Sequence, residues 1–207
     1  LLVLAPLFQA APLEGARPRT ITLDGEAEAE IDFAELAAGE PVPCADADSH
    51  APAVIGYTSG TTGLPKGAVL THANLRACAL QTALSEGSTV ERRTLLCVPL
   101  AFTGGIVNNF LSTYASGGTL VLEPEFVPDR VIELLETERI TTLFAVPVMW
   151  QAIASTDAFA EADLTSLKSA ICGGAPVPQK LLDAYLAKSV TITEAYGLTE
   201  ASPGVCA

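Results

Sequence analysis

Short apolar runs alternate with longer amphipathic segments through the second half of the chain. The runs are rich in β-branched and leucine residues, which predicts buried strands at 94–98, 119–122, 141–146, 169–172 and 190–193. The segments between them predict helices at 104–114, 128–137, 147–154 and 178–187. Strands that alternate with helices are typical of an α/β fold with a doubly wound, largely parallel sheet flanked by helices. We therefore predict that architecture.

The pattern is less regular before this region. Strands are predicted at 53–57 and 68–70, and Thr71 is placed to cap a helix that runs from His72 to Ser85. Further upstream, the pattern indicates strands at 1–4 and 20–23 and a short helix at 32–38, with little else. We predict that residues 1–49 are an irregular remnant of a preceding subdomain and that 50–207 form an α/β subdomain.

Composition narrows the classes of function. The 207 residues carry a formal net charge of −13, and no basic cluster exceeds Arg92-Arg93, so a nucleic-acid partner is not expected. The five cysteines are scattered without C-x-x-C spacing, which favours reduced, mostly buried thiols in a cytoplasmic protein. The apolar run at the N-terminus is too short to cross a bilayer, so no membrane span is predicted.

A loop rich in Ser, Thr and Gly follows the strand at 53–57. Its glycines allow backbone N–H groups to approach an anion, its hydroxyls can donate hydrogen bonds, and Lys66 adds a positive charge. The loop is not the P-loop of nucleotide hydrolases, because Pro65 precedes the lysine and Gly67 stands where that motif has Ser or Thr. The pattern predicts a phosphate-binding loop; the alternative is a flexible loop that joins two strands.

Three other segments follow predicted strands, at 99–105, 173–178 and 194–203. Ligands of doubly wound sheets bind beyond the carboxyl ends of the strands, so these segments are candidate walls of a site. Gly173-Gly174-Ala175-Pro176 could let a flat ring lie against backbone, or could be only a tight turn. Tyr196 could stack on a base and Thr199 could donate to a phosphate. Glu200 could hold Mg²⁺, or could simply stabilise a helix N-terminus.

Together these motifs resemble the adenylate-forming superfamily, which includes acyl-CoA synthetases, luciferases and the adenylation domains of peptide synthetases. The matching segments are Tyr57–Gly67, Gly173–Pro176 and Tyr196–Glu200, in that order, and the likeness covers the chain from about residue 51 to its end. The resemblance implies that a carboxylate attacks the α-phosphate of ATP, that pyrophosphate leaves, and that the acyl group then passes to CoA or another thiol. It also implies ATP, Mg²⁺ and CoA as ligands.

The resemblance assigns roles to individual residues. Lys66, Thr199 and Glu200 are the catalytic candidates, with Thr199 at the α-phosphate and Glu200 as the magnesium ligand. The residues from Thr58 to Lys66 surround the β- and γ-phosphates, and the Gly173 turn and Tyr196 line the adenine pocket. The ATP-binding candidates are Thr58, Ser59, Gly60, Thr61, Thr62, Gly63, Lys66, Gly173, Gly174, Ala175, Ala195, Tyr196, Gly197 and Thr199.

The segment Phe102-Thr103-Gly104 is the candidate for contact with the acid. Phe102 stands where many acyl-CoA synthetases have a histidine and resembles the aromatic residue of peptide-synthetase domains; ordinary core packing is the alternative. Those domains place an Asp next, to pair with an α-ammonium group, whereas this chain has Thr103. A neutral hydroxyl cannot offset a buried ammonium, so we predict an uncharged aliphatic or aryl carboxylic acid.

Several features fall outside these motifs. Neither His50 nor His72 has a carboxylate nearby in sequence, and no catalytic role is assigned to them. Met149 and Trp150 are predicted to be core residues. By the resemblance, the C-terminal lid domain and its lysine lie beyond this chain, so we expect a fragment that is inactive alone. The alternatives are a non-catalytic nucleotide- or acyl-binding module and an adenylation domain for a non-amino-acid carboxylate. The family also suggests fatty acid metabolism.

Overall fold

The computed structural model describes residues 2–4, 20–22, 31–32, 35, 38–40, 46–59, 64–100, 102–202 and 204. The chain forms two compact units, residues 1–46 and 47–207, and each is described by itself. Among the described residues, no helix has both the length and the apolar character that a membrane span requires.

The first unit contains a small parallel sheet in the order β1-β2-β3. Two of its strands were predicted, and the third was not: Asp32 was expected to begin a helix, but it ends a strand that pairs with β2. The rest of that predicted helix lies mostly outside the described residues. The assignment of this unit to a preceding subdomain stays a prediction. The strands are β1 (Leu2–Leu4), β2 (Thr20–Thr22) and β3 (Ile31–Asp32).

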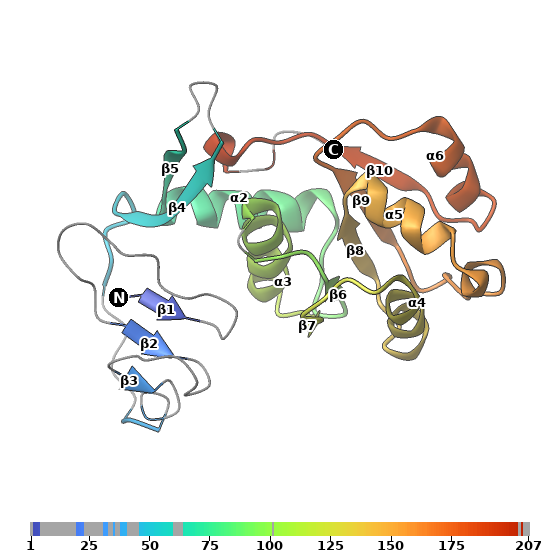
Figure 1. Ribbon diagram of the computed structural model, residues 1–207. Helices are drawn as coiled ribbons and strands as arrows, with labels where there is room; N and C mark the ends of the chain where they lie inside the picture. Colours follow the sequence, from blue (N-terminus) through green and yellow to red (C-terminus); the bar gives the residue numbers. More distant parts are fainter. Residues whose placement is uncertain are drawn as a thin grey trace. The chain divides into compact units, whose positions relative to one another are not determined.

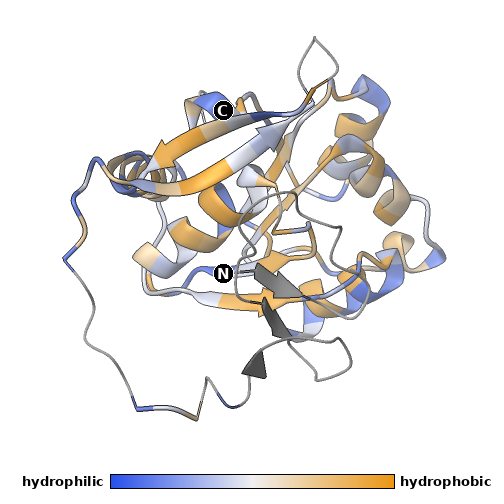
Figure 2. Cartoon of the chain, turned by 60° about the vertical axis from the view of Figure 1, so that its left-hand side comes forward, coloured by the Kyte–Doolittle hydropathy of each residue, from blue (hydrophilic) through white to orange (hydrophobic). Residues whose placement is uncertain are grey.

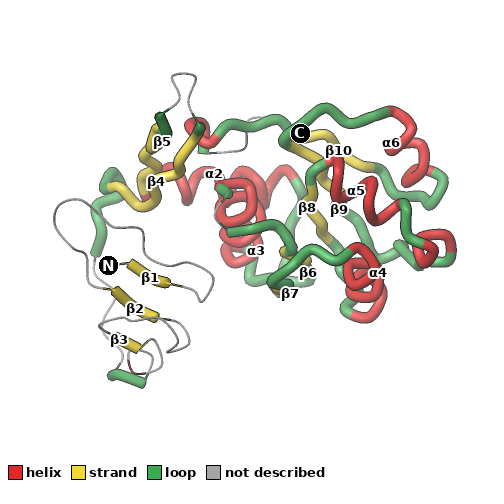
Figure 3. The backbone as a smooth tube through the Cα atoms, viewed as in Figure 1, coloured by secondary structure: helices red, strands yellow, loops and turns green. Residues whose placement is uncertain are grey.

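The second unit is built on a five-stranded sheet in the order β10-β9-β8-β6-β7, and every pair in it is parallel. Each strand is followed by a helical segment before the next strand begins, as Figure 3 traces. The predicted α/β fold with a parallel sheet is confirmed. The strands are β6 (Arg93–Leu96), β7 (Thr119–Leu122), β8 (Thr142–Ala145), β9 (Ser169–Gly173) and β10 (Ile192–Ala195).

Helices cover both faces of this sheet (Figure 1). One face packs against α4, α5 and α6 through the main apolar core, in which Leu143, Trp150 and Tyr185 are fully buried. The other face lies toward α2 and the segment after β6. The sheet strands are largely hydrophobic, and the helices carry both hydrophobic and hydrophilic residues (Figure 2). The helices are α2 (His72–Ser85), α3 (Ser112–Ala115), α4 (Pro128–Thr137), α5 (Pro147–Ala154) and α6 (Gln179–Leu186), with short 3₁₀ turns η2 (Asp157–Ala160) and η3 (Thr199–Ala201).

The segment after β6 differs from the predicted α-helix. Gly104–Leu111 forms a π-helix, η1, which continues into α3. The side-chain amide of Asn109 donates a hydrogen bond of 2.8 Å to the carbonyl oxygen of Gly104, within this wider turn. Stretches of π-helix are rare and are frequently found at functional sites, and apolar periodicity does not distinguish them from α-helix.

A separate antiparallel hairpin, β4 (Pro52–Thr58) and β5 (Lys66–Thr71), precedes α2. Lys66, predicted to lie in the loop, is the first residue of β5 and stands opposite Thr58 in the register. Thr71 caps α2 as predicted, because its hydroxyl accepts a hydrogen bond from the backbone of Asn74 while the Asn74 side chain accepts one from the Thr71 backbone.

Candidate active site

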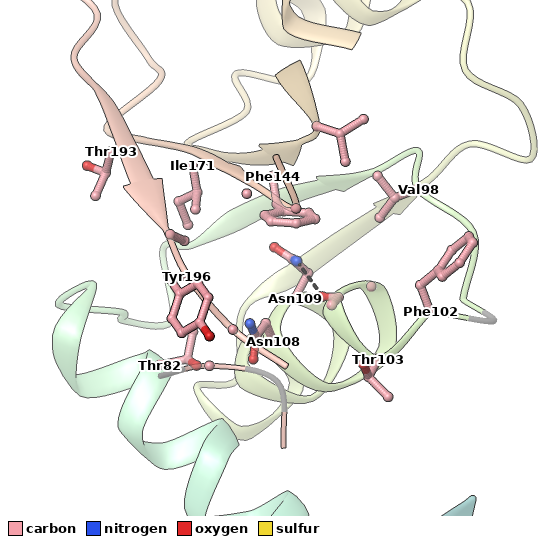
Figure 4. Close-up of a pocket in the computed structure, with 18 of the residues that line it drawn as sticks. Thr82, Val98, Phe102, Thr103, Asn108, Asn109, Phe144, Ile171, Thr193 and Tyr196 are labelled. Atoms are coloured by element: carbon pink, nitrogen blue, oxygen red, sulfur yellow. Dashed lines mark hydrogen bonds between the residues drawn. The ribbon is translucent and has the colours of Figure 1, made fainter. Parts of the chain in front are cut away.

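A cavity of about 970 Å³ lies over the face of the sheet that α2 and η1 cover. Figure 4 shows Phe144, Ile171 and Thr193 on the sheet side, and Thr82, Asn108 and Asn109 on the helical side. Successive side chains of a strand point to opposite faces, so every second residue of β9 and β10 reaches this space. The cavity thus occupies the gap between the two layers of the second unit.

Glycines shape the mouth of the cavity beyond β9. A Cβ on Gly173 would lie 3.1 Å from the carbonyl oxygen of Ala195 and 3.2 Å from the Phe144 ring, closer than a side chain comfortably allows. Gly174 has a φ of +87°, a conformation that favours glycine. The turn is therefore both tight and open to a flat ligand, and Tyr196 stands beside it with its side chain 58% exposed.

Two threonines from distant segments meet at the same mouth. The hydroxyls of Thr103, which is buried, and Thr199 lie 3.3 Å apart. Gly56 of β4 packs against both, since a Cβ there would stand 2.6 Å from Thr199 Cγ2 and 3.1 Å from Thr103 Cγ2. The absence of a side chain at Gly56 brings the hairpin against η3.

The hairpin also meets the candidate magnesium ligand. Thr58 Oγ1 donates a hydrogen bond of 3.5 Å to Glu200 Oε1, across 142 positions of sequence. Lys66 is the register partner of Thr58 and is exposed. Both strands of the hairpin pack against η3. The structure therefore brings Thr58 and Lys66, from one predicted motif, close to Glu200, from another.

The predicted site residues as a whole divide into three groups. Nine of them line the cavity: Phe102, Thr103, Gly104, Gly173, Gly174, Ala195, Tyr196, Gly197 and Thr199. Five are described but do not line it: Thr58, Ser59, Lys66, Ala175 and Glu200. Gly60, Thr61, Thr62 and Gly63 lie outside the described residues.

Phe102 is 67% exposed and lines the cavity, so the alternative of ordinary core packing is wrong for it. Met149, predicted to be a core residue, packs against the main core but also reaches the cavity wall. Trp150 is fully buried as predicted, and its indole N–H donates to the carbonyl oxygen of Ile171. His50 and His72 are not among the residues that line the cavity.

Several cavity residues were not predicted from the sequence, because they lie away from the carboxyl ends of the predicted strands. Phe144 lies within a strand, Ser169 is the first residue of β9, and Glu86 follows the C-terminal end of α2 and accepts a hydrogen bond from Ser169. The adjacent amides Asn108 and Asn109, in an otherwise apolar segment, were the one available signal. Asn109 is only 2% exposed, which is unusual for a side chain with two hydrogen-bonding groups.

Burial affects the titrating groups near the sheet. Desolvation raises the pKa of Glu86, although Arg92 and Ser169 act to lower it. Burial likewise raises the pKa of Cys97 and of Cys172 to about 11, so both stay protonated thiols at neutral pH. Cys78, Cys97 and Cys172 are buried and free, as the scattered cysteine pattern predicts.

The described residues hold no group of three or more His, Cys, Asp or Glu side chains that could bind a metal ion by themselves. Magnesium rarely needs one, because it keeps several waters and commonly uses one or two carboxylates together with substrate phosphates. Glu200 is exposed in η3, and among the described residues its side chain accepts a hydrogen bond from one partner, Thr58. That arrangement suits a magnesium ion brought in with a nucleotide.

The family of AMP-binding enzymes matches residues 4–207, and the chain belongs to this family. Its relatives are named as CoA ligases. A feruloyl-CoA synthase of Amycolatopsis sp. is 42% identical over 149 residues, which are 72% of this chain and 30% of that protein. The long-chain-fatty-acid–CoA ligase FadD13 of Mycobacterium tuberculosis strain H37Rv is 33% identical over 203 residues, 97% of this chain and 39% of that one.

Solved structures similar to this chain come from proteins of the same kind. The inhibitor-bound N-terminal domain of FACL13 from Mycobacterium tuberculosis matches with a TM-score of 0.80 and 30% identity, over 88% of this chain and 44% of that one. ATP-bound MatB from Rhodopseudomonas palustris matches with a TM-score of 0.78 and 27% identity, over 89% of this chain and 36% of that one. The chain thus spans about a third of the length of the curated relatives described above.

Proposed function

We propose that the protein carrying this chain activates a carboxylic acid with ATP and transfers the acyl group to CoA or a similar thiol. Apart from its carboxylate, the acid is uncharged. In the first step a carboxylate oxygen attacks the α-phosphorus, and the bond to the bridging oxygen breaks as pyrophosphate leaves. In the second step the thiol sulfur attacks the carbonyl carbon, AMP leaves, and the thiol proton is released. The observation that carries the proposal is the meeting of Thr103 with Thr199 at the cavity mouth, and of Thr58 with Glu200, the residue next to Thr199.

Each role follows from position. The Gly173 turn and Tyr196 offer a flat surface and an aromatic ring to adenine. Thr199, next to Glu200, is the proposed donor to the α-phosphate. Lys66 and the hydroxyl of Thr58 hold the departing pyrophosphate. Because pyrophosphate is an anion and the chain is acidic overall, its binding needs a local positive charge. Phosphoryl chemistry of this kind depends on positioning and charge neutralisation more than on covalent help.

Glu200 would hold the magnesium ion, which supplies charge neutralisation at the phosphate oxygens. The acid would occupy the cavity, with its carboxylate toward Thr103 and Thr199. Phe102, Phe144 and Ile171 supply apolar walls for its tail. The neutral hydroxyl of Thr103 leaves an α-ammonium group without a partner, so an uncharged acid is favoured. The relatives named as feruloyl-CoA and fatty-acid–CoA ligases support both aryl and aliphatic tails.

The test is pyrophosphate exchange by the protein at its natural full length, with a panel of carboxylic acids. Lys66→Ala and Glu200→Gln should each lower the rate by about 10²-fold, the typical effect of removing one preorganised charge-stabilising group. Lys180→Ala, an exposed lysine on α6 away from the cavity, is the matched control and should leave the rate unchanged. ATP handling unaltered in both test variants would refute the assignment of the site. No exchange with any acid would favour a non-catalytic binding module.

A further inference from the structure

The helical wall of the cavity changes its hydrogen-bond register directly after Thr103. The carbonyl oxygen of Phe102 accepts a hydrogen bond of 3.2 Å from the backbone N–H of Ile106, four residues later, as in an α-helix. The π-helix η1 begins at Gly104, and in a π-helix each carbonyl pairs with the N–H five residues later. The α-helical pattern returns in α3. The wider turns are therefore confined to the stretch that borders the cavity.

The side chain of Asn109 favours this π register. Its amide nitrogen Nδ2 donates a hydrogen bond of 2.8 Å to the carbonyl oxygen of Gly104, five residues earlier, which is the dashed line in Figure 4. In the π register the backbone N–H of Asn109 is directed at the same carbonyl, whose two lone pairs can accept both donors. In an α-helix that carbonyl would pair with the N–H of Asn108 instead. The Asn109 side chain therefore holds Gly104 in the π register.

The burial of Asn109 makes this bond costly to lose. Asn109 is 2% exposed, and a buried amide without a hydrogen bond destabilises the fold. The neighbouring amide has a different partner, because Asn108 Oδ1 accepts a hydrogen bond of 3.1 Å from the thiol of Cys78 on α2. Asn108 thus joins η1 to α2, whereas Asn109 bonds to the backbone of η1 itself.

The π turns lie between two fixed points. A Cβ on Gly105 would stand 2.9 Å from the carbonyl oxygen of Pro99, so the backbone here approaches as closely as only glycine allows. Further along, Asn108 holds η1 against α2. A ring closed by π pairing takes up one more residue than the ring of an α-helix. If the π turns reverted to α-helix, the extra residue would be displaced to the start of the segment, where Phe102 and Thr103 face the cavity.

Thr103 is sensitive to such a displacement. It is buried, and its hydroxyl lies 3.3 Å from that of Thr199, so a shift of about 1 Å would break the contact. The surface proposed for adenine belongs to other elements, because Gly173 ends β9 and Tyr196 follows β10. A change in η1 therefore acts on the side of the site that is proposed to hold the acid.

We propose that Asn109 is a positioning residue for the acid. By holding Gly104 in the π register, it sets Phe102 and Thr103 at the cavity mouth, where the carboxylate is activated. The identity of the ligand as an acid rests on the proposed function. Loss of the Asn109 amide should weaken use of the acid and leave ATP binding unchanged.

The test substitution is Asn109→Leu in the full-length protein, since Leu has a similar size but no donor. The KM for the acid should rise about tenfold, the scale of one lost hydrogen bond to a buried carbonyl. The KM for ATP should not change. Both constants are measured by pyrophosphate release with the best acid of the panel. Equal rises in the two constants, or an unchanged KM for the acid, would overturn the proposal.

Ser112→Ala is the matched control. Ser112 is fully buried, its hydroxyl donates to the backbone carbonyl of Asn108, and it is not among the residues that line the cavity. The substitution removes a buried side-chain-to-backbone hydrogen bond close to η1, so it should lower the melting temperature without raising the KM for the acid. A similar rise in this variant would mean that lost stability, and not the register, is the cause.

Asn109→Thr is the second variant, and it answers the question if Asn109→Leu does not fold. Thr keeps a hydroxyl donor, but in helices this hydroxyl bonds to carbonyls three or four residues earlier and does not support a pairing of five. The KM for the acid should therefore rise in this variant too, and a wild-type value would contradict the proposal.

Hydrogen exchange measured by mass spectrometry without any ligand reports on the register directly. Peptides that cover residues 102–112 should exchange faster in Asn109→Leu and Asn109→Thr than in the wild type. If exchange is unchanged while the KM for the acid rises, Asn109 contacts the acid directly and the positioning role is wrong.

The two hypotheses can fail separately. If exchange in η1 increases as expected but no acid supports pyrophosphate release, the role of Asn109 in holding the register is supported and the proposed function is wrong. If acids are activated and neither exchange nor the KM for the acid responds to Asn109→Leu, the proposed function stands and the role of Asn109 is wrong.

Discussion

Gly56 is the residue on which the closeness of hairpin and cavity mouth depends. A methyl group there would stand 2.6 Å from Thr199 Cγ2 and 3.1 Å from Thr103 Cγ2, and real Cβ atoms do not approach other atoms as closely as the first distance. Gly56→Ala should therefore lower the free energy of unfolding by about 1–3 kcal/mol, the usual cost of overpacking. Urea unfolding followed by circular dichroism measures the change.

Two controls separate this clash from a general effect of replacing glycine. Gly104→Ala places its Cβ 3.6 Å from the Phe144 ring, an ordinary contact, and should not destabilise the fold. Thr199→Ser removes the methyl group nearest to the new Cβ and keeps the hydroxyl. Combined with Gly56→Ala, it should recover most of the lost stability, as coupled neighbours do. An identical cost in both backgrounds would mean that the clash is not the cause.

Some residues of the candidate site could be predicted from the sequence, and others could not. Phe102, Thr103 and Tyr196 follow predicted strands, and the carboxyl ends of parallel strands meet at one edge of a sheet, so their gathering could be foreseen. Glu86 could not, because it reaches the cavity only through the packing of α2 across the sheet and through its ion pair with Arg92. Nothing in the local sequence distinguishes this carboxylate from a solvated one.

At the scale of elements, the start of α2 offers a direct test. The hydroxyl of Thr71 accepts a hydrogen bond of 3.2 Å from the Asn74 backbone, and Asn74 Oδ1 accepts one of 3.0 Å from the Thr71 backbone. Thr71→Ala should lower the free energy of unfolding by about 1 kcal/mol, whereas Thr71→Ser should retain most of the cap. Thermal and urea unfolding of the three proteins provide the comparison, and equal losses in Ala and Ser variants would exclude capping as the cause.

Helices could be predicted from the sequence where characteristic residues stand at their ends. Pro128 and Pro147 stand in the first turns of α4 and α5, and both helices occupy their predicted ranges. The π-helix at Gly104–Leu111 could not be predicted, because its wider turns leave the same apolar spacing as an α-helix over so short a stretch. The start of β5 at Lys66 was missed for another reason: pairing with Thr58 decides it, and the composition of the loop does not.

For the whole molecule, the sequence predicts a parallel sheet but not its strand order. β8 lies between β6 and β9, and β7, which is second of the five in sequence, takes the edge. Apolar runs of similar length and composition do not indicate which strands pair with each other. The strand order therefore depends on how the helices pack. The position of the cavity follows from that order, since β8, β9 and β10 together form its floor.

Two arginines that are neighbours in sequence, Arg92 and Arg93, form ion pairs with residues at the ends of helices α2 and α4. Substitutions at these two positions test how much such ion pairs stabilise the packing of the helices on the sheet. Arg92 and Arg93 each form an ion pair of 2.6 Å, but the side chains of the Arg92–Glu86 pair are 3% and 15% exposed and those of the Arg93–Glu138 pair 34% and 43%. Removing one partner of a buried pair leaves an uncompensated charge, so Arg92→Met should lower the free energy of unfolding by about 3–5 kcal/mol. Arg93→Met, the matched control, should cost about 1 kcal/mol or less because water screens the exposed pair. Urea unfolding measures both losses of unfolding free energy. Similar losses in the two variants would mean that the distance between the charged groups, and not their burial, determines how much each ion pair stabilises the protein.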